Sequence, residues 1–379
     1  MTKLATHSGQ LERWLGKDTV EHLSASMRDW YGPPIAVGSI PGSRIVVAKG
    51  GDFRGRIIEG RVGTALDYVG DRLRNIGRAV QRVARDNAKG ATLHAGFASV
   101  SEVFAAISAG KVITQQFQKA GATGVAAVTN SLWGLGALPA AGANASNAPG
   151  GDAPTDATTG APTFTNPGGT MTTHFIGAMV QASLANTLLA YDRIFQVNKT
   201  MNSTANEAVT GVPSRYQNTT GGTVDSAEGN FLFVEVGGTA LAATAHNWDT
   251  CLYTDQSNNA SAALPTITGN SGAIVRRLDH PAGQWFAPLA SGDTGVKALT
   301  QMHCSAAVAT GVINFVIGHP LLWLPVPLVN VAVTHEGITV GGMNTLVRMF
   351  DDAAVAFLEV CKPATTATNY NVQLKWAYN

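Results

Sequence analysis

The chain has 379 residues, of which 13% are charged and 42 are glycine, and its formal net charge is +1. Typical soluble domains carry about 25% charged residues, so this composition argues against a freely diffusing enzyme and favours a β-rich protein that buries surface against neighbours. The small net charge excludes binding of a polyanion by the overall charge of the protein. Residues 1–98 nevertheless carry 15 Lys/Arg against 9 Asp/Glu, so contact with nucleic acid is expected only through this basic N-terminal region.

Residues 1–96 are expected to form a helical arm. Residues 11–31 have helical apolar spacing in two pieces, with Asp18 as the cap that restarts the helix. Residues 35–58 alternate around two turn signals, which predicts a small β-hairpin. The N-terminus has no apolar signal-peptide core, so we expect the protein to fold in the cytoplasm.

Residues 62–89 are predicted to form a heptad helix. Apolar residues follow an unbroken 4-3 spacing from Val62 to Val83. Three glycines occupy the same heptad position, although glycine costs about 1 kcal/mol relative to alanine inside a helix. The helix is therefore either an amphipathic helix packed on its own domain or one that docks closely on a partner. The candidate interface residues are Gly63, Gly70, Gly77, Arg74, Arg78, Arg82 and Arg85.

The next 74 or so residues connect the arm to a β domain. Residues 97–133 are predicted as a helix over 97–118 and a connecting segment, with Ser99 and Glu102 as a capping box and Gly110 as a possible end of the helix. Residues 134–170 form a linker rich in Gly, Ala, Pro and Thr.

Residues 171–379 are predicted to be a β domain. Runs of five to ten apolar residues, separated by Gly, Asn and Pro, are typical of a β-sandwich or jelly roll. Strands are expected within 229–238, 246–255, 298–308, 311–319 and 321–334. Residues 174–183 and 187–197 are expected to be paired strands, with one helix as the alternative, and 370–378 a closing strand. Residues 349–360 fit either strand or helix. The fold class is therefore mainly β, with a helical N-terminal region that includes the small hairpin, and no membrane span is expected.

The sequence predicts no catalytic, metal or cofactor site. It has no phosphate-binding loop and no metalloprotease or serine-hydrolase motif. The isolated histidines are expected to be structural, as are the odd-numbered cysteines. Neither a triad of Ser271, Asp279 and His280 nor a calcium site at 351–359 has the spacing it needs. Asp192-Arg193 is expected to be an internal ion pair or a subunit contact.

From about residue 97 onward the chain resembles a family of structural proteins of tailed-bacteriophage virions. The resemblance is carried by FASVSEVF, NSLWGLG, ATTGAPTFTNPGG, LLAYDRIFQV, EAVTGVPSRYQ and GQWFAPLASGDTGVKALTQMHCSA. It implies a non-enzymatic virion component without a catalytic motif. The low charge and β-rich composition predict that the chain works as a homo-oligomer, expected to be a trimer, and the resemblance implies other virion proteins such as the capsid shell as further partners.

Three roles remain open for such a chain. We favour a capsid cement or decoration protein, because the usual long loop and spine helix of a tailed-phage shell protein are not evident in the sequence. The alternative is the major capsid protein itself. A carbohydrate-binding adhesin or tail module is suggested by Trp248 and Trp285, which a binding module would expose and a scaffold would bury. Trp285 and Phe286 are expected to be core anchors.

The glycine-marked heptads can be tested with Gly70→Leu. On a free helix edge the substitution should stabilise the protein by up to about 1 kcal/mol through helix propensity. Against a close neighbour, the added side chain should cost roughly 1–3 kcal/mol by overpacking and should impair assembly. We expect the second result in thermal unfolding and particle assembly, and a stabilised variant that assembles normally would contradict it.

Overall fold

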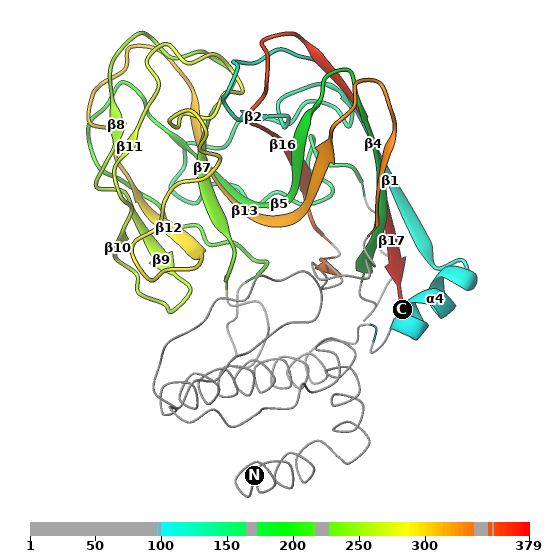
Figure 1. Cartoon of the computed structure of the whole chain (residues 1–379). Coiled ribbons are helices and arrows are strands. Elements are labelled where there is room, and N and C mark those ends of the chain that lie inside the picture. The colour runs from blue at the N-terminus through cyan, green and yellow to red at the C-terminus, as the bar shows by residue number, and fades with distance from the viewer. Residues whose placement is uncertain (1–96, 98–99, 164–172, 217–226, 337–347, 351) are drawn as a thin grey trace, which may run out of the picture. The chain divides into compact units, whose positions relative to one another are not determined.

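The computed structural model describes residues 97, 100–163, 173–216, 227–336, 348–350 and 352–379 (Figure 1). The predicted helices and hairpin of the N-terminal 96 residues lie outside this range, and so do Gly63, Gly70, Gly77 and the four arginines of the heptad helix. In the part that is described, the chain is mainly β, as predicted, and every strand pair is antiparallel. No helix in these ranges combines the length and the apolar character needed to cross a membrane.

The strands form three sheets and one two-stranded ladder. The first sheet has the order β14 (Val333–Glu336), β4 (Thr173–Ala182), β17 (Thr368–Tyr378), β1 (Val112–Ala122) and β3 (Ala137–Leu138), with β15 (Arg348–Met349) also beside β4. The second has the order β2 (Asn130–Ser131), β16 (Val355–Val360), β5 (Asn186–Lys199), β13 (Ile313–Val326) and β7 (Phe231–Val236). The third has the order β10 (Ala262–Ala263), β9 (Leu252–Asp255), β12 (Val296–Met302) and β6 (Glu207–Ala208), and β11 (Ile267–Thr268) pairs with β8 (Asn247–Trp248).

The long strands β5 and β13 are shared by two hydrophobic cores. Their pairing runs from Ile313 opposite Lys199 to Val326 opposite Asn186, with a register shift between Ile317 and Gly318. Figure 1 shows the two strands curving from the β9–β12 side of the molecule to the β4–β17–β1 side. A Cβ on Gly318 would lie 2.7 Å from the Tyr191 ring, so glycine lets the two strands stay close at this bend.

Each half of this strand pair covers a different sheet. The β4–β17–β1 half contributes Leu188 and Leu324 to a core with Trp376. The other half contributes Phe195 and Phe315 to a core with the β9–β12 sheet and the β8–β11 ladder. These cores bury the apolar runs that carry almost no charge in the sequence. The hydrophobic burial of these runs explains why strands 231–236, 313–326 and 368–378 appear where the sequence predicts them.

β13 contains prolines, which a strand with hydrogen-bonded partners on both sides would not tolerate. β7 accompanies β13 only from Ile313 to Gly318, so in the described residues the rest of β13, including Pro320 and Pro325, has β5 alone as its partner. A proline whose missing N–H faces the unpaired side removes no ladder hydrogen bond. The predicted strands over 311–319 and 321–334 are therefore one strand through Val326, followed by a short β14.

The predicted helix over 97–118 stops beside Gly110, which was named as its possible end, and the prediction of helix beyond this glycine is wrong. Helix α4 (Val100–Ser108) ends at Gly110, which has a φ of 74° and donates its N–H to the Ile107 carbonyl at 3.0 Å. The chain then becomes β1, which pairs with β17 from Val112 opposite Ala377. Burial alternates along this segment, as it does in a strand: Gln115, Phe117 and Lys119 are buried, whereas the residues between them are exposed.

The predicted pairing of residues 174–183 with 187–197 is also wrong. Both segments are strands, β4 and β5, but they belong to different sheets. β4 pairs with β17 and β14, and β5 pairs with β13 and β16. The short turn at 184–185 thus carries the chain from one layer to the other. Residues 355–360, which were ambiguous in sequence, form β16.

Two histidines, the fully buried His280 and the partly buried His319, should make the fold sensitive to mild acid. Burial lowers the pKa of His280 and of His319 to about 4, so the native state excludes a proton that the unfolded chain binds below about pH 6.5. The stability that comes from keeping these two side chains neutral is therefore fully present above pH 6.5, and it is lost as the pH falls towards 4. Each histidine should contribute roughly 2 kcal/mol to the loss between pH 7 and pH 5.

Urea unfolding at these two pH values checks this prediction. His319 donates through Nδ1 to Asn230 Oδ1 at 2.8 Å and stacks on Tyr216 with ring centroids 3.8 Å apart. His319→Phe keeps a ring for the stack and removes the titration. The pH-dependent part of the unfolding free energy should therefore shrink by roughly 2 kcal/mol. An unchanged pH dependence in the variant would show that His319 titrates normally.

Candidate functional site

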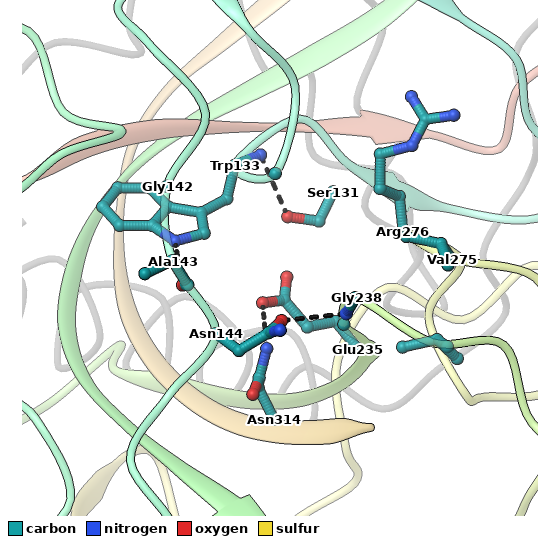
Figure 2. A pocket seen from close by; sticks show the side chains of 13 residues that line it. Ser131, Trp133, Gly142, Ala143, Asn144, Glu235, Gly238, Val275, Arg276 and Asn314 are labelled. Atoms are coloured by element: carbon teal, nitrogen blue, oxygen red, sulfur yellow. Dashed lines mark hydrogen bonds between the residues drawn. The ribbon is translucent and has the colours of Figure 1, made fainter. Parts of the chain in front are cut away.

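A surface pocket of about 170 Å³ lies beside the end of β7 (Figure 2). Its mouth is formed by exposed residues such as Gly134, Asn144 and Gly238, and Arg276 lies at one side. Its floor is formed by buried residues. These floor residues are Ser131, Trp133, Glu235 and Asn314. We call this site the Glu235 pocket.

Backbone contacts fix the Trp133 wall of the Glu235 pocket. The indole Nε1 donates to the Ala143 carbonyl at 3.0 Å, and the Trp133 backbone N–H donates to Ser131 Oγ at 3.3 Å. A Cβ on Gly142 would lie 2.2 Å from the indole ring, so only glycine lets this segment cross the ring. The Gly- and Ala-rich composition of residues 134–163 thus has a structural reason: the segment packs closely on the β5–β13 sheet.

The floor carries a buried carboxylate with one unused oxygen. Alternation along β7 places Phe231, Phe233 and Glu235 on the same face. Glu235 Oε1 accepts hydrogen bonds from Arg193 Nη2 at 2.5 Å and from Asn314 Nδ2 at 3.2 Å. Glu235 Oε2 has no hydrogen-bond partner, although the residue is only 3% exposed. Figure 2 shows this carboxylate directed into the pocket, opposite Ser131 and Trp133.

The carboxylate belongs to a network that continues beneath the pocket. The Arg193 guanidinium lies 4.8 Å from the Trp133 ring centroid and donates through Nε to Gln196 at 2.7 Å. Gln196 Nε2 in turn donates to Asp152 Oδ2 at 3.4 Å, and the backbones of Gln196 and Asp152 form a β-bridge. Asp152 therefore anchors the predicted linker segment on β5.

Asp192 and Arg193 are internally paired, but not with each other. Successive residues of a strand point to opposite faces, and each of these two finds its own counter-charge. Arg215 Nη2 donates to Asp192 Oδ1 at 2.8 Å, while Arg193 pairs with Glu235. Asp352 is a second acceptor for Arg215, at 3.3 Å. The alternative of a subunit contact does not describe Asp192 or Arg193, because both are fully buried within this chain.

The residues of the imagined hydrolase triad do not converge. Asp279 Oδ2 is bound by His246 Nε2 and Trp248 Nε1, both at 2.8 Å. His280 instead accepts the Val234 backbone N–H through Nε2 at 2.9 Å. Burial opposes protonation of His246, but the hydrogen bond and charge of Asp279 raise its pKa overall. The hydrogen bonds among His246, Trp248 and Asp279 hold separate segments of the fold together. This is the structural role expected for an isolated histidine.

Other candidate ligands are also used in structural contacts. Glu359 accepts a hydrogen bond from the Tyr370 hydroxyl and lies 3.2 Å from Lys362 Nζ. This candidate calcium ligand is therefore engaged in structural contacts. Within the described ranges, no three His, Cys, Asp or Glu side chains are grouped so that they could hold a metal ion. Cys251 and Cys304 are buried free thiols in the core, as predicted, whereas Cys361 is exposed.

A second hollow, of about 280 Å³, is lined by aromatic residues. The Trp285 ring lies 5.0 Å from Phe231, 4.6 Å from Phe286 and 5.2 Å from Trp323. Phe286 is 41% and Trp323 47% exposed. The prediction that Phe286 is a core anchor is therefore wrong, and Trp285 is only half-buried. Trp248, by contrast, lies in the core, as a scaffold residue would.

The Arg193–Glu235 pair provides a stability test. Arg193→Met should cost about 3–5 kcal/mol because it leaves Glu235 as an uncompensated buried charge. The double variant Arg193→Met/Glu235→Leu should recover most of this loss, because a buried ion pair and an apolar pair of similar volume are often close in energy. Urea unfolding of the wild type, both single variants and the double variant measures the coupling. Purely additive losses would contradict the pairing.

The Glu235 pocket brings together a polar floor and an opening at the protein surface. Several buried polar atoms of the described residues lack a hydrogen-bond partner, Glu359 Oε2 and His280 Nδ1 among them, and Glu235 Oε2 is the one whose residue lines this pocket. No protein-family model, no curated protein and no solved structure matches this chain.

Proposed function

We propose that this chain is a non-enzymatic structural component of a tailed-phage virion, a cement or decoration protein that works as a homo-oligomer on the capsid. The sequence resemblance, the low charge and the antiparallel sheets support this proposal. We also assign the described strands to the β-sandwich class, because residues of facing sheets share each core. The observation that carries the proposal is an exposed apolar protrusion between β13 and β14.

This protrusion, residues 327–332, consists of six consecutive exposed residues. Its large apolar side chains Leu328, Val329 and Val331 are 56%, 48% and 47% exposed. Asn330 holds the loop on β4: its N–H donates to the Ala182 carbonyl at 2.8 Å, and its carbonyl accepts from Gln181 Nε2 at 2.9 Å. A contiguous apolar segment that is already ordered can bind a neighbour at little entropic cost. We assign a second copy of this chain as that neighbour.

A charge-insertion pair tests this assignment. Leu328→Asp/Val331→Asp should shift the protein towards monomer in size-exclusion chromatography with light scattering, because the interface would have to bury unpaired carboxylates. The unfolding free energy should change by less than about 1 kcal/mol, because both sites are exposed.

Val212→Asp is the matched control, because Val212 is 57% exposed elsewhere in the chain. This control should leave the oligomer unchanged. A wild-type protein that is monomeric at all concentrations, or a double variant that assembles normally, would contradict the proposal. The position of the chain in an imaged particle separates a cement protein from the alternative, the major capsid protein.

The exposed aromatic residues favour a second candidate, a carbohydrate-binding module. Exposed indole and phenyl faces beside polar groups, here Asp293 and Thr294, are suited to stacking on sugar rings. Under this reading, Trp323→Ala should abolish glycan binding on an array while leaving the melting temperature within a few degrees of the wild type. Absence of glycan binding by the wild-type protein would remove this candidate.

A further inference from the structure

The Glu235 pocket offers a strong acceptor that the described part of the chain does not use. Two donors converge on Oε1, and none reaches Oε2. A buried carboxylate oxygen without a donor loses the hydration it had in the unfolded chain. Glu235 lines a surface pocket, and its carboxylate is directed into it (Figure 2). Oε2 itself is almost inaccessible to solvent, so a donor that enters the pocket reaches it after a small shift of the surrounding side chains.

The charges around the pocket favour a cation as that donor. Glu235 and Asp152 carry two negative charges, and Arg193, which links them through Gln196, carries one positive charge. The network is thus left with one net negative charge. Arg276 at the side of the pocket directs its Nη2 to the carbonyl and hydroxyl of Thr123, at 2.9 and 3.2 Å. These neutral partners leave its positive charge in place at the side of the pocket, but they hold the guanidinium away from the Glu235 carboxylate (Figure 2).

The walls of the pocket suit an alkyl chain. Trp133, Val236 and Val275 line it together with several glycines. Ser131 Oγ lies across the pocket from Glu235, in a position to make a second polar contact with a bound group (Figure 2). An apolar stem with a terminal charged donor matches walls of this kind and a carboxylate at the floor.

We propose that the Glu235 pocket binds a primary ammonium group on an alkyl stem, with Glu235 Oε2 as the acceptor. The group belongs either to a small free amine or to a lysine side chain of a bound protein. An ammonium supplies up to three N–H donors, which a quaternary ammonium of the same charge lacks. The site is separate from the protrusion at 327–332 and does not depend on the virion proposal.

The test uses the full-length chain and n-butylammonium chloride as the probe. Calorimetric titration and ligand-observed NMR should show saturable binding at one site. Tetramethylammonium chloride at the same ionic strength should bind at least about tenfold more weakly, a difference of about 1.4 kcal/mol, because it has the charge but no N–H donor. Comparable binding of the two cations would overturn the proposal, as would absence of saturable n-butylammonium binding.

Two glycines in one segment provide a matched pair of variants. A Cβ on Gly134, which lines the pocket, would have Arg276 Cγ at 4.0 Å as its nearest neighbour, and a Cβ on Gly136 would have nothing within 4 Å. Gly134→Leu should therefore fold, obstruct the mouth and weaken n-butylammonium binding by at least about tenfold. Gly136→Leu should bind as the wild type does. Equal binding by both variants would place the amine elsewhere and overturn the assignment.

The source of the ammonium group is decided by a second probe. Nα-acetyl-lysine methylamide has the same terminal group as n-butylammonium, with the backbone of a lysine residue attached. Tighter binding of this compound, lost in Gly134→Leu, would indicate a lysine of a partner protein. Tighter binding of n-butylammonium would indicate a small free amine. If Gly134→Leu does not fold, the comparison of n-butylammonium with tetramethylammonium on the wild type still decides the proposal.

Discussion

Burial of two adjacent opposite charges in the middle of β5 constrains the whole described structure. Asp192 and Arg193 point to opposite faces of the strand, so neither can neutralise the other. Arg215 reaches one face from a loop, and Glu235 reaches the other from β7. A buried charge without a partner costs several kcal/mol, so β5 can occupy the centre only when both of these segments are in place. The same requirement fixes the floor of the Glu235 pocket.

Hydrophobic alternation was sufficient to predict most strands but not their partners. The apolar runs at 231–236, 313–318 and 370–378 are strands because one or both faces are buried. These runs could not reveal that β4 and β5 lie in different sheets. Alternation shows which face of a strand is buried, but it does not show which strand lies beside it. Residues 112–118 were predicted as part of a helix, and they are a strand because they pair with β17, more than 240 residues later along the chain.

One residue of the Glu235 pocket could be singled out from the sequence, and the others could be recognised only from the structure. Glu235 is the single charged residue in FLFVEV, and a carboxylate inside a buried strand requires partners. Those partners come from positions 42 residues before it and 79 residues after it, and Trp133 comes from a segment that reads as a linker. The exposure of Phe286 was equally hidden, because hydrophobicity alone places such a ring in a core.

The prolines of β13 have a consequence for how the molecule meets its neighbours. Beyond Gly318 this strand is an open sheet edge in the described residues, and an open edge invites a strand from another chain to extend the sheet. Pro320 and Pro325 deprive that edge of amide donors, so a foreign strand cannot form a continuous hydrogen-bonded ladder along it. The two prolines thereby oppose edge-to-edge aggregation through β13. Any contact that another chain makes along this edge must then rest on side chains and not on a shared sheet.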